Sequence, residues 1–279
     1  MAAVRMAAGR KPWITALVCA TAATAAVGVT GCAAGAATGA PGHHAPAAAP
    51  DPRTGADADA IAEQAVQVTK EAIGLHVTGG PDEDLQDGLR IDVAADERGA
   101  CAGTMDRQGT TADLIAADGA LFLRAEEPFW RAAVAAGKHG ADPAETEAMV
   151  GYLSLPGRWL KVADADLTRD LDLGTVCDLD TLRDRVDQDR SARTGLTRVD
   201  DASVNGRKAI VLKNRRLTLY VAKEGVPYLL RSVRTDDTTP ATATPATTTY
   251  TFSDHGKSVV AGRPAEHDIV DLQRLDAGF

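Results

Sequence analysis

The sequence predicts an α+β fold with an antiparallel sheet, and three observations indicate it. Short segments of alternating apolar residues, separated by glycine-containing turns, are typical of an antiparallel meander in residues 88–126. A second meander of the same kind covers residues 197–256. Apolar residues recur at helical spacing before the first meander and between the two.

The ordered part of the chain opens with an amphipathic helix over residues 59–72. Ile61, Ala65, Val68 and Ala72 recur there at helical spacing and therefore share one side. The first meander then provides four strands. They are expected at residues 88–96, 100–108, 111–118 and 120–126.

A mainly helical block separates the two meanders. Two helices are predicted at residues 126–137 and 142–153, followed by a short strand at 158–162. A third helix is predicted at residues 177–189, because its apolar residues fall on one side. The block therefore supplies three of the expected helices.

The second meander contains a segment without core-forming residues. Residues 236–249 are rich in Thr and Pro and are predicted to form a long loop between the last two strands. The chain is predicted to close with a short helix at residues 264–275. Length allows one or two domains in residues 61–279, and we expect a single one.

The first 31 residues have the layout of a secretory signal peptide. Three cationic residues precede a long uncharged run of small and apolar residues. No cationic cluster follows to stop transfer, although a retained membrane-spanning helix is the alternative. Residues 29–32, Val-Thr-Gly-Cys, resemble the bacterial lipobox. The resemblance implies a diacylglyceryl group on Cys32 and a mature chain that begins there; a secreted chain with an unmodified cysteine is the other alternative.

The residues after Cys32 predict a tether. Residues 32–60 are mostly Ala, Gly and Pro, so they have nothing to bury, and a flexible segment of this length spans about 30 Å. We therefore expect the domain at the extracytoplasmic face of the cell membrane, with the membrane as its partner through the lipid. The net charge of −9 argues against nucleic acid as a partner.

Two cysteines remain if Cys19 leaves with the leader and Cys32 is acylated. Cys101 and Cys177 are an even pair in an oxidising compartment, which predicts a disulfide. Two buried free thiols are the alternative. No C-x-x-C pair or neighbouring histidine accompanies them, so no metal site is expected.

Three stretches, together with the lipobox, resemble the LppX/LprG-type lipoproteins of actinobacteria, which share the fold of the LolA-type carriers. The stretches are residues 101–130, residues 155–162, and residues 220–233 followed by 250–259. The resemblance implies a strongly curved antiparallel sheet, a half-barrel, with helices packed on its concave face. Several members of that group hold lipids there. The Thr- and Pro-rich insertion and the aromatic content of 4% depart from the group and bear on the size of any cavity.

Five aromatic residues fall where the helices and strands of that group meet the sheet. A sheet with one apolar face and helices over it either packs solid or encloses a pocket. Each of the five is therefore either a core residue or a cavity-lining residue. These candidate lining residues are Phe122, Phe129, Trp130, Tyr152 and Trp159.

The sequence contains no catalytic or cofactor-binding motif. The patterns G-x-S-x-G, H-E-x-x-H, G-x-G-x-x-G and the P-loop are absent. Ser253, Asp254 and His255 are neighbours, but neighbours at a strand end point in different directions and form no triad. We therefore expect no enzyme, no cofactor and no metal. Two functions remain: a carrier or binder of a lipid, glycolipid or other amphiphile, or an interaction or sensor module without a transported ligand.

Overall fold

The structure is a computed structural model and describes six stretches of the chain. They are residues 57–82, 88–107, 109–137, 143–162, 176–236 and 245–271. The predicted leader, Cys32 and nearly all of the predicted tether lie outside the described residues. No helix in these stretches combines the length and the apolar character needed to span a membrane.

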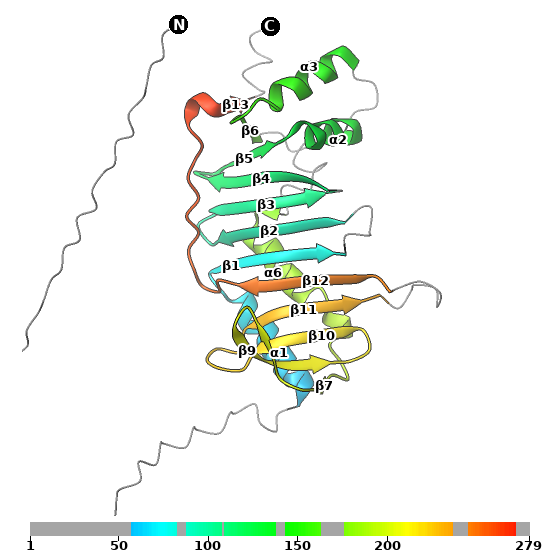
Figure 1. Cartoon of the computed structure of the whole chain (residues 1–279). Helices are drawn as coiled ribbons and strands as arrows, with labels where there is room; N and C mark the ends of the chain where they lie inside the picture. The colour runs from blue at the N-terminus through cyan, green and yellow to red at the C-terminus, as the bar shows by residue number, and fades with distance from the viewer. Residues whose placement is uncertain are drawn as a thin grey trace, which may run out of the picture. The chain divides into compact units, whose positions relative to one another are not determined.

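One large sheet forms the centre of the domain (Figure 1). Its strand order within the described chain is β13-β6-β5-β4-β3-β2-β1-β12-β11-β10-β9-β7, with β8 paired to β9. The strands are β1 (Gly74–Pro81), β2 (Leu89–Asp96), β3 (Cys101–Arg107), β4 (Thr110–Ala117), β5 (Ala120–Ala125), β6 (Trp159–Val162), β7 (Thr197–Arg198), β8 (Ala202–Val204), β9 (Arg207–Lys213), β10 (Leu217–Ala222), β11 (Leu229–Thr235), β12 (Thr247–Ser253) and β13 (Ile269–Asp271).

The predicted fold class is confirmed. The sheet is antiparallel apart from the parallel pair of β13 and β6, and it curves without closing into a barrel, since its order ends at β13 on one side and β7 on the other. Both predicted meanders are present, and the β1–β12 ladder joins them. The chain is therefore α+β around one open sheet.

The helices cover one face of this sheet, as predicted. α1 (Ala58–Lys70) contacts β7, β10 and β11, and α6 (Leu179–Asp187) contacts β1 and β2. At the other end, α2 (Glu127–Gly137) contacts β4, and α3 (Pro143–Leu153) contacts α2. All four helices contribute buried residues to the same hydrophobic core. In Figure 1, α1 and α6 lie behind the sheet, and α2 and α3 lie at the end of the sheet that holds β5 and β6.

Side-chain burial follows the alternation that the sequence predicted. In β2, Ile91 and Val93 are buried and Asp92 is exposed. In β1, Val77 is buried and Thr78 is exposed. Successive strand residues point to opposite faces, so the buried set faces the helices. We call the other side, which carries Thr78 and Asp92, the open face.

Two contacts fix α1 and α6 to the sheet. The Thr69 hydroxyl donates to the Ala65 carbonyl at 2.7 Å and accepts the Leu229 N–H at 2.8 Å, which links α1 to β11. Cys101, at the start of β3, is bonded to Cys177, just before α6. The predicted disulfide is thus confirmed. Closing a loop of 76 residues stabilises the fold by about 4 kcal/mol if the loss of unfolded-chain entropy dominates.

The prediction for the end of the chain was wrong. In place of a helix, the described part of residues 264–275 contains a short 3-10 helix, η2 (Glu266–Asp268), followed by β13. Ile269 and Val270 are β-branched and pair in parallel with β6, and local periodicity does not reveal such a distant pairing. The predicted 236–249 loop is also shortened, because β12 begins at Thr247.

Strand β1 was not predicted, although it lies at the centre of the sheet. Gly79 and Gly80 adopt φ angles of 133° and 155°, and a Cβ on Gly79 would lie 2.0 Å from the Thr249 carbonyl oxygen. Only glycine permits this close approach of β1 to β12. The same glycines hide the strand in the sequence, since they interrupt its apolar alternation.

Residues 254–268 connect β12 to β13, and they run past the ends of the strands that lie between these two (Figure 1). The Val259 N–H donates to the buried Asp96 carboxylate at 2.8 Å, and the Arg98 guanidinium donates to the same carboxylate at 2.8 Å. Burial raises the pKa of Asp96, but hydrogen bonds from Arg98, Val259 and Ala100 outweigh it and leave the pKa below its ordinary value. This contact fixes the connection that brings β13 to β6.

Candidate functional site

The five aromatic residues predicted from the sequence occupy both faces of the sheet. Phe129 and Trp130, at the start of α2, are buried in the core with their ring centres 5.5 Å apart in an edge-to-face arrangement. The Trp130 indole N–H donates to the Ala125 carbonyl at 3.0 Å. These two rings hold α2 against the sheet.

Phe122 and Trp159 lie on the open face, because the residues next to them in β5 and β6 point into the core. The guanidinium carbon of Arg263 is 5.5 Å from the centre of the Phe122 ring, and that of Arg124 is 4.5 Å from the Trp159 ring. Both rings are buried beneath cationic side chains. The run Ala-Leu-Phe-Leu in β5 has no alternation that could have assigned Phe122 to a face.

Tyr152, in the last turn of α3, is the most exposed of the five, at 37%. It lines a pocket of about 240 Å³ together with Lys161 and Asp271, whose charged groups are 3.0 Å apart and link β6 to β13. The five aromatic residues therefore do not line one common cavity.

A larger pocket, of about 750 Å³, opens where β5 leads into α2. Its walls are the β3–β4 turn, open-face side chains of β4 and β5, the first turn of α2, and the connection from α3 to β6. The volume falls within the usual range for small-molecule sites. The lining residues are Gly109, Thr110, Thr111, Asp113, Arg124, Ala125, Glu126, Glu127, Pro128, Phe129, Ser154, Leu155, Pro156 and Gly157.

The lining of this pocket is amphipathic. Pro128, Leu155 and Pro156 provide exposed apolar surface, and Leu155 is 45% exposed. Arg124 pairs with Asp113 at 2.8 Å, while Glu126 and Glu127 add two further carboxylates. The polar part of the pocket is thus acidic overall, which disfavours an anionic group and suits a neutral hydroxyl-rich or cationic one.

One arginine ties together the helices that flank this pocket. Arg131 of α2 donates to both carboxylate oxygens of Glu147 on α3, at 2.8 and 3.1 Å, and to Glu127 at 2.6 Å. Hydrogen bonds from Arg131 lower the pKa of Glu147, and those to Glu147 and Glu127 raise the pKa of Arg131. Because the cluster is exposed, it sets the helix spacing more than it stabilises the fold.

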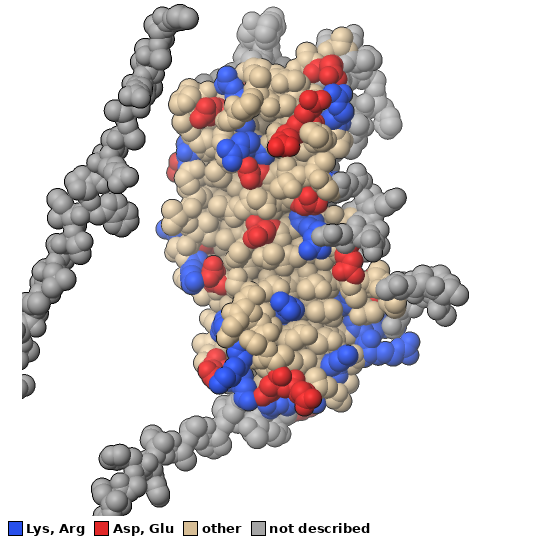
Figure 2. Space-filling view, in the orientation of Figure 1, with Lys and Arg blue, Asp and Glu red and all other residues tan. Residues whose placement is uncertain are grey.

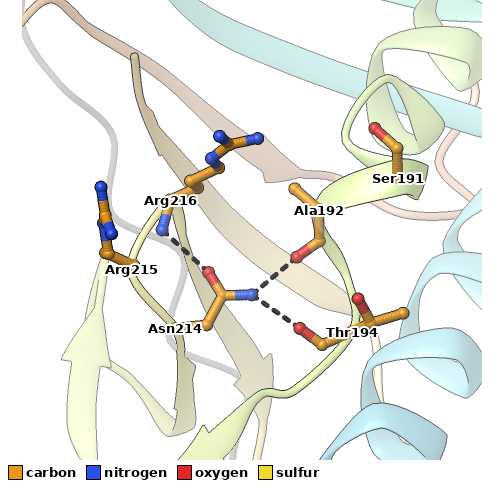
Figure 3. A pocket seen from close by; sticks show the side chains of 6 residues that line it. All are labelled: Ser191, Ala192, Thr194, Asn214, Arg215 and Arg216. Carbon is orange, nitrogen blue, oxygen red and sulfur yellow. Dashed lines mark hydrogen bonds between the residues drawn. The ribbon is translucent and has the colours of Figure 1, made fainter. Parts of the chain in front are cut away.

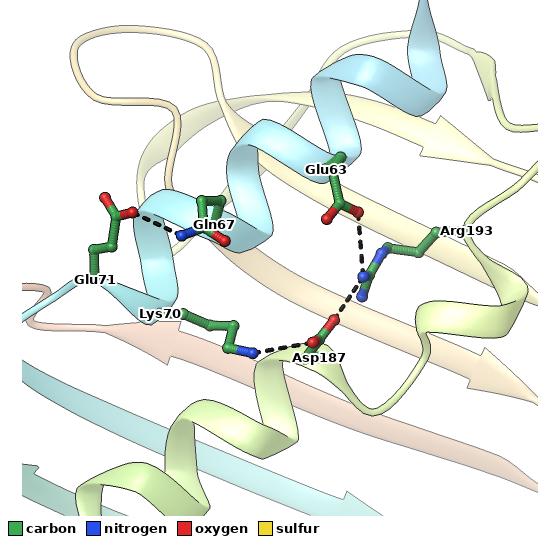
Figure 4. A network of polar contacts seen from close by, with 6 residues as sticks. All are labelled: Glu63, Gln67, Lys70, Glu71, Asp187 and Arg193. Carbon is green, nitrogen blue, oxygen red and sulfur yellow. Dashed lines mark hydrogen bonds and ion pairs between the residues drawn. The ribbon is translucent and has the colours of Figure 1, made fainter.

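A different polar network holds the other end of the domain (Figure 4). Asp187 of α6 accepts from Lys70 of α1 at 3.0 Å and from the buried Arg193 at 2.5 Å. Arg193 also reaches Glu63 of α1 at 3.3 Å. Burial raises the pKa of Asp187, but the hydrogen bonds from Arg193 and Lys70 outweigh it and lower the pKa. This network fastens α1 to α6.

The structure brings His76, and not His255, to Ser253. The Ser253 hydroxyl lies 3.2 Å from His76 Nδ1, and His76 Nε2 lies 2.5 Å from Asp92. The three residues lie on the open face and line neither of the two pockets above. Strand N–H groups lie in the plane of the sheet, so they are not directed at an oxyanion above Ser253. Among the described residues, the backbone N–H groups of these strands are therefore not placed as oxyanion donors for Ser253.

His255 has a structural environment instead. Its ring stacks on Tyr228, with centres 4.2 Å apart, and its Nε2 donates to the Leu229 carbonyl at 3.2 Å. Burial lowers the pKa of His255 to about 4, because desolvation disfavours the charged ring. It is therefore neutral at physiological pH.

No known protein-family model and no curated protein matches the chain. Among solved structures, the chain is similar to LprF from Mycobacterium bovis, with 15% identity, a TM-score of 0.45, and coverage of 75% of this chain and 97% of LprF. It is also similar to MucB in the MucA/MucB complex of Pseudomonas aeruginosa, with 12% identity, a TM-score of 0.31, and coverage of 74% of this chain and 59% of that one. A LolA superfamily protein from Nitrosomonas europaea gives 10% identity, a TM-score of 0.21, and coverage of 74% and 96%.

The similarities to LprF and to a LolA superfamily protein agree with the resemblance expected from the sequence. At these identities and scores, the similarities assign neither a ligand nor an activity to this chain.

Proposed function

We propose that this protein is a non-enzymatic lipoprotein of the cell envelope that binds and carries an amphiphile in the pocket between β5 and α2. The observation that carries the proposal is the pocket's amphipathic lining, which combines the exposed apolar residues Pro128, Leu155 and Pro156 with an acidic group of polar residues. An amphiphile presents the same two kinds of surface. The excess of carboxylates favours a lipid with a hydroxyl-rich head group, such as a glycolipid, over an anionic phospholipid.

The proposal includes a lipid anchor. The Val-Thr-Gly-Cys sequence at residues 29–32 supports a diacylglyceryl group on Cys32, and two acyl chains hold a protein on a bilayer stably where one does not. The anchor would keep the pocket within reach of the extracytoplasmic leaflet. We expect the Cys32→Ser chain to be released into the medium of its own host. Retention of this variant in the membrane fraction would contradict the anchor.

The binding half of the proposal is tested by lipid extraction. Protein purified from its own host without added lipid is extracted with organic solvent and analysed by mass spectrometry. We expect one class of amphiphile to be enriched over total membrane lipid in repeated preparations. Extracts that match the membrane lipid composition would contradict carriage.

A matched pair of variants connects the extracted ligand to the pocket. Thr111 and Thr78 are both exposed strand residues of the open face, and each hydroxyl donates to a nearby aspartate. Thr111 lines the pocket and Thr78 does not. We expect Thr111→Trp to reduce the bound amphiphile at least tenfold and Thr78→Trp to leave it unchanged. Equal ligand content in both variants would place the ligand elsewhere.

A second candidate function rests on the surface of α3 and the residues that follow it. Met149, Tyr152 and Leu155 are large apolar residues that are 38%, 37% and 45% exposed. Exposed apolar groups of this kind can serve as a protein contact. If the chain is an interaction module, Met149→Glu reduces recovery of a partner in cross-linked membranes while the extracts of wild-type protein contain no enriched lipid.

A further inference from the structure

A second site lies at the end of the domain where α1 begins. The carboxylate of Asp59, in the first turn of α1, accepts the N–H groups of Gly195 and Leu196 at 2.9 and 2.8 Å. The segment around residue 194 is therefore fixed against the start of α1. The predicted tether ends at this same point of the domain, because its last residues lead directly into α1.

A pocket of about 360 Å³ lies beside this segment (Figure 3). It is lined by side chains from the β9–β10 turn and from the region of η1 (Arg190–Ala192), a short 3-10 helix. Hydroxyl and guanidinium groups dominate the lining, and both can donate hydrogen bonds to a phosphate group. The lining residues are Ser191, Ala192, Thr194, Asn214, Arg215 and Arg216.

Asn214 fixes the shape of this pocket. Its side-chain amide donates to the carbonyls of Ala192 and Thr194 at 2.7 and 3.0 Å, and its side-chain oxygen accepts the N–H groups of Arg216 and Leu217, both at 2.9 Å. The β9–β10 turn is thereby joined to the loop after η1 (Figure 3). The turn therefore holds the backbone of its two arginines in one place.

Cationic residues are concentrated around the pocket. Lys213, Arg215 and Arg216 lie within four consecutive residues, Arg190 directly precedes the pocket residue Ser191, and all four are exposed. We call these four residues the basic tip. Figure 2 shows Lys and Arg gathering at the lower right of the molecule, at the end that holds β9 and β10 in Figure 1. This concentration contrasts with the net charge of −9 of the whole chain.

Three acidic groups near the basic tip have partners among the described residues. Asp59 is bonded to the two N–H groups named above, and Asp187 is paired with Lys70 and Arg193. Asp189 is buried and accepts from the Ser232 hydroxyl at 2.9 Å. Exposed charges are screened over about 8 Å at physiological ionic strength. A surface close to the basic tip therefore interacts with the local positive charge of the tip and not with the net charge of the whole chain.

We infer that the basic tip docks the domain onto anionic phospholipid head groups of the membrane that anchors it. The partner follows from charge complementarity and from the position of the tip, next to the point where the predicted tether enters the domain. The pocket receives a head-group phosphate among Ser191, Thr194 and the two turn arginines. The inference rests on the proposed membrane anchoring, but its test does not use the anchor.

The test compares vesicles of two compositions. The Cys32→Ser chain is mixed with vesicles of phosphatidylcholine alone or with 30% phosphatidylglycerol added, and binding is measured by co-sedimentation. We expect the ratio of the two affinities to exceed tenfold at low salt and to fall towards one at 0.5 M salt. The protein is taken from the medium, so that the leader with its three cationic residues is absent from the assay.

A matched pair of double variants locates the contact. Arg207 and Lys208 are also an exposed cationic pair at one end of β9, and Arg215 and Arg216 follow its other end. Each cation near an anionic surface contributes roughly fivefold to affinity, so Arg215→Gln/Arg216→Gln should lower the ratio about 25-fold or abolish the preference. Arg207→Gln/Lys208→Gln should leave it nearly unchanged.

Three results would overturn the inference. The first is equal affinity for the two vesicle compositions. The second is an equal effect of the two double variants, which would indicate general charge attraction. The third is vesicle binding that inorganic phosphate does not reduce at constant ionic strength, which would show that no head-group phosphate enters the pocket. Failure to extract a carried amphiphile leaves all three readouts unaffected.

Discussion

The two ends of the sheet differ in how completely helices cover them. At the β1–β7 end, α1 and α6 contact five strands between them, and the disulfide and Asp187 network bind these helices to the sheet and to each other. At the β3–β6 end, α2 contacts β4, and α3 contacts α2. The pocket of about 750 Å³ lies at this second end.

This difference indicates a division of labour within one sheet. The closely covered end supplies buried apolar area and satisfied polar groups, which stabilise the fold. The loosely covered end leaves Leu155 and Tyr152 partly exposed around pockets, as the proposed binding function requires. Elements with fewer packed contacts open at lower free-energy cost, which suits a region that admits and releases an amphiphile.

The largest expected effect compares one substitution at the two ends. Leu182 of α6 is fully buried in the core, whereas Leu155 is 45% exposed. We expect Leu182→Ala to lower the free energy of unfolding by about 3 kcal/mol, because it leaves a cavity. Leu155→Ala should change it by less than about 0.5 kcal/mol. Denaturant unfolding of both variants measures this difference, and similar losses would mean that the two ends are equally packed.

The next effect concerns pH and the closely covered end. His255 has a pKa of about 4 in the fold and about 6.5 when unfolded. Between these two pH values the His255 ring is therefore mostly protonated in the unfolded chain and mostly neutral in the folded one. The stability from the neutral ring is complete above pH 6.5 and is lost as the pH falls towards 4. Allowing for partial exposure, we expect a loss of about 2 kcal/mol.

The control for this prediction is His255→Phe, which keeps the stack on Tyr228 and cannot titrate. Other groups with shifted pKa values, such as the buried Asp189, titrate equally in both proteins. The difference in unfolding free energy between wild type and variant should therefore change between pH 7.5 and pH 4.5. A constant difference would show that His255 does not titrate as its burial implies.

Local patterns predicted much of the fold. The helix expected at 59–72 is α1, the helix expected at 177–189 is α6, and the first meander matches β2 to β5. Each of these elements is buried on one side only. One-sided burial requires apolar residues at a regular spacing, and this spacing is visible in the sequence. β1 and β13 were not predicted, because glycines obscure the first and a parallel partner distant in the sequence determines the second.

The site was less accessible to sequence reasoning. The pocket joins residues near Thr111 to residues near Leu155, and such proximity depends on how α2 and α3 turn back over the strand ends. Similarly, Ser253 and His76 meet across 177 residues, while the adjacent His255 points elsewhere. Phe122 and Trp159 were candidate lining residues together with Phe129 and Trp130, but strand alternation places Phe122 and Trp159 on the open face, away from the core that the other two join.

The central claim is that the pocket at the loosely covered end holds the amphiphile. The most direct measurement is photo-cross-linking of the purified full chain with a glycolipid that carries a photoactivatable acyl chain, followed by peptide mapping. The account predicts adducts on residues 109–113 and 154–157, and their loss in Thr111→Trp but not in Thr78→Trp. Adducts confined to the α1 and α6 end, or spread evenly over the surface, would contradict it.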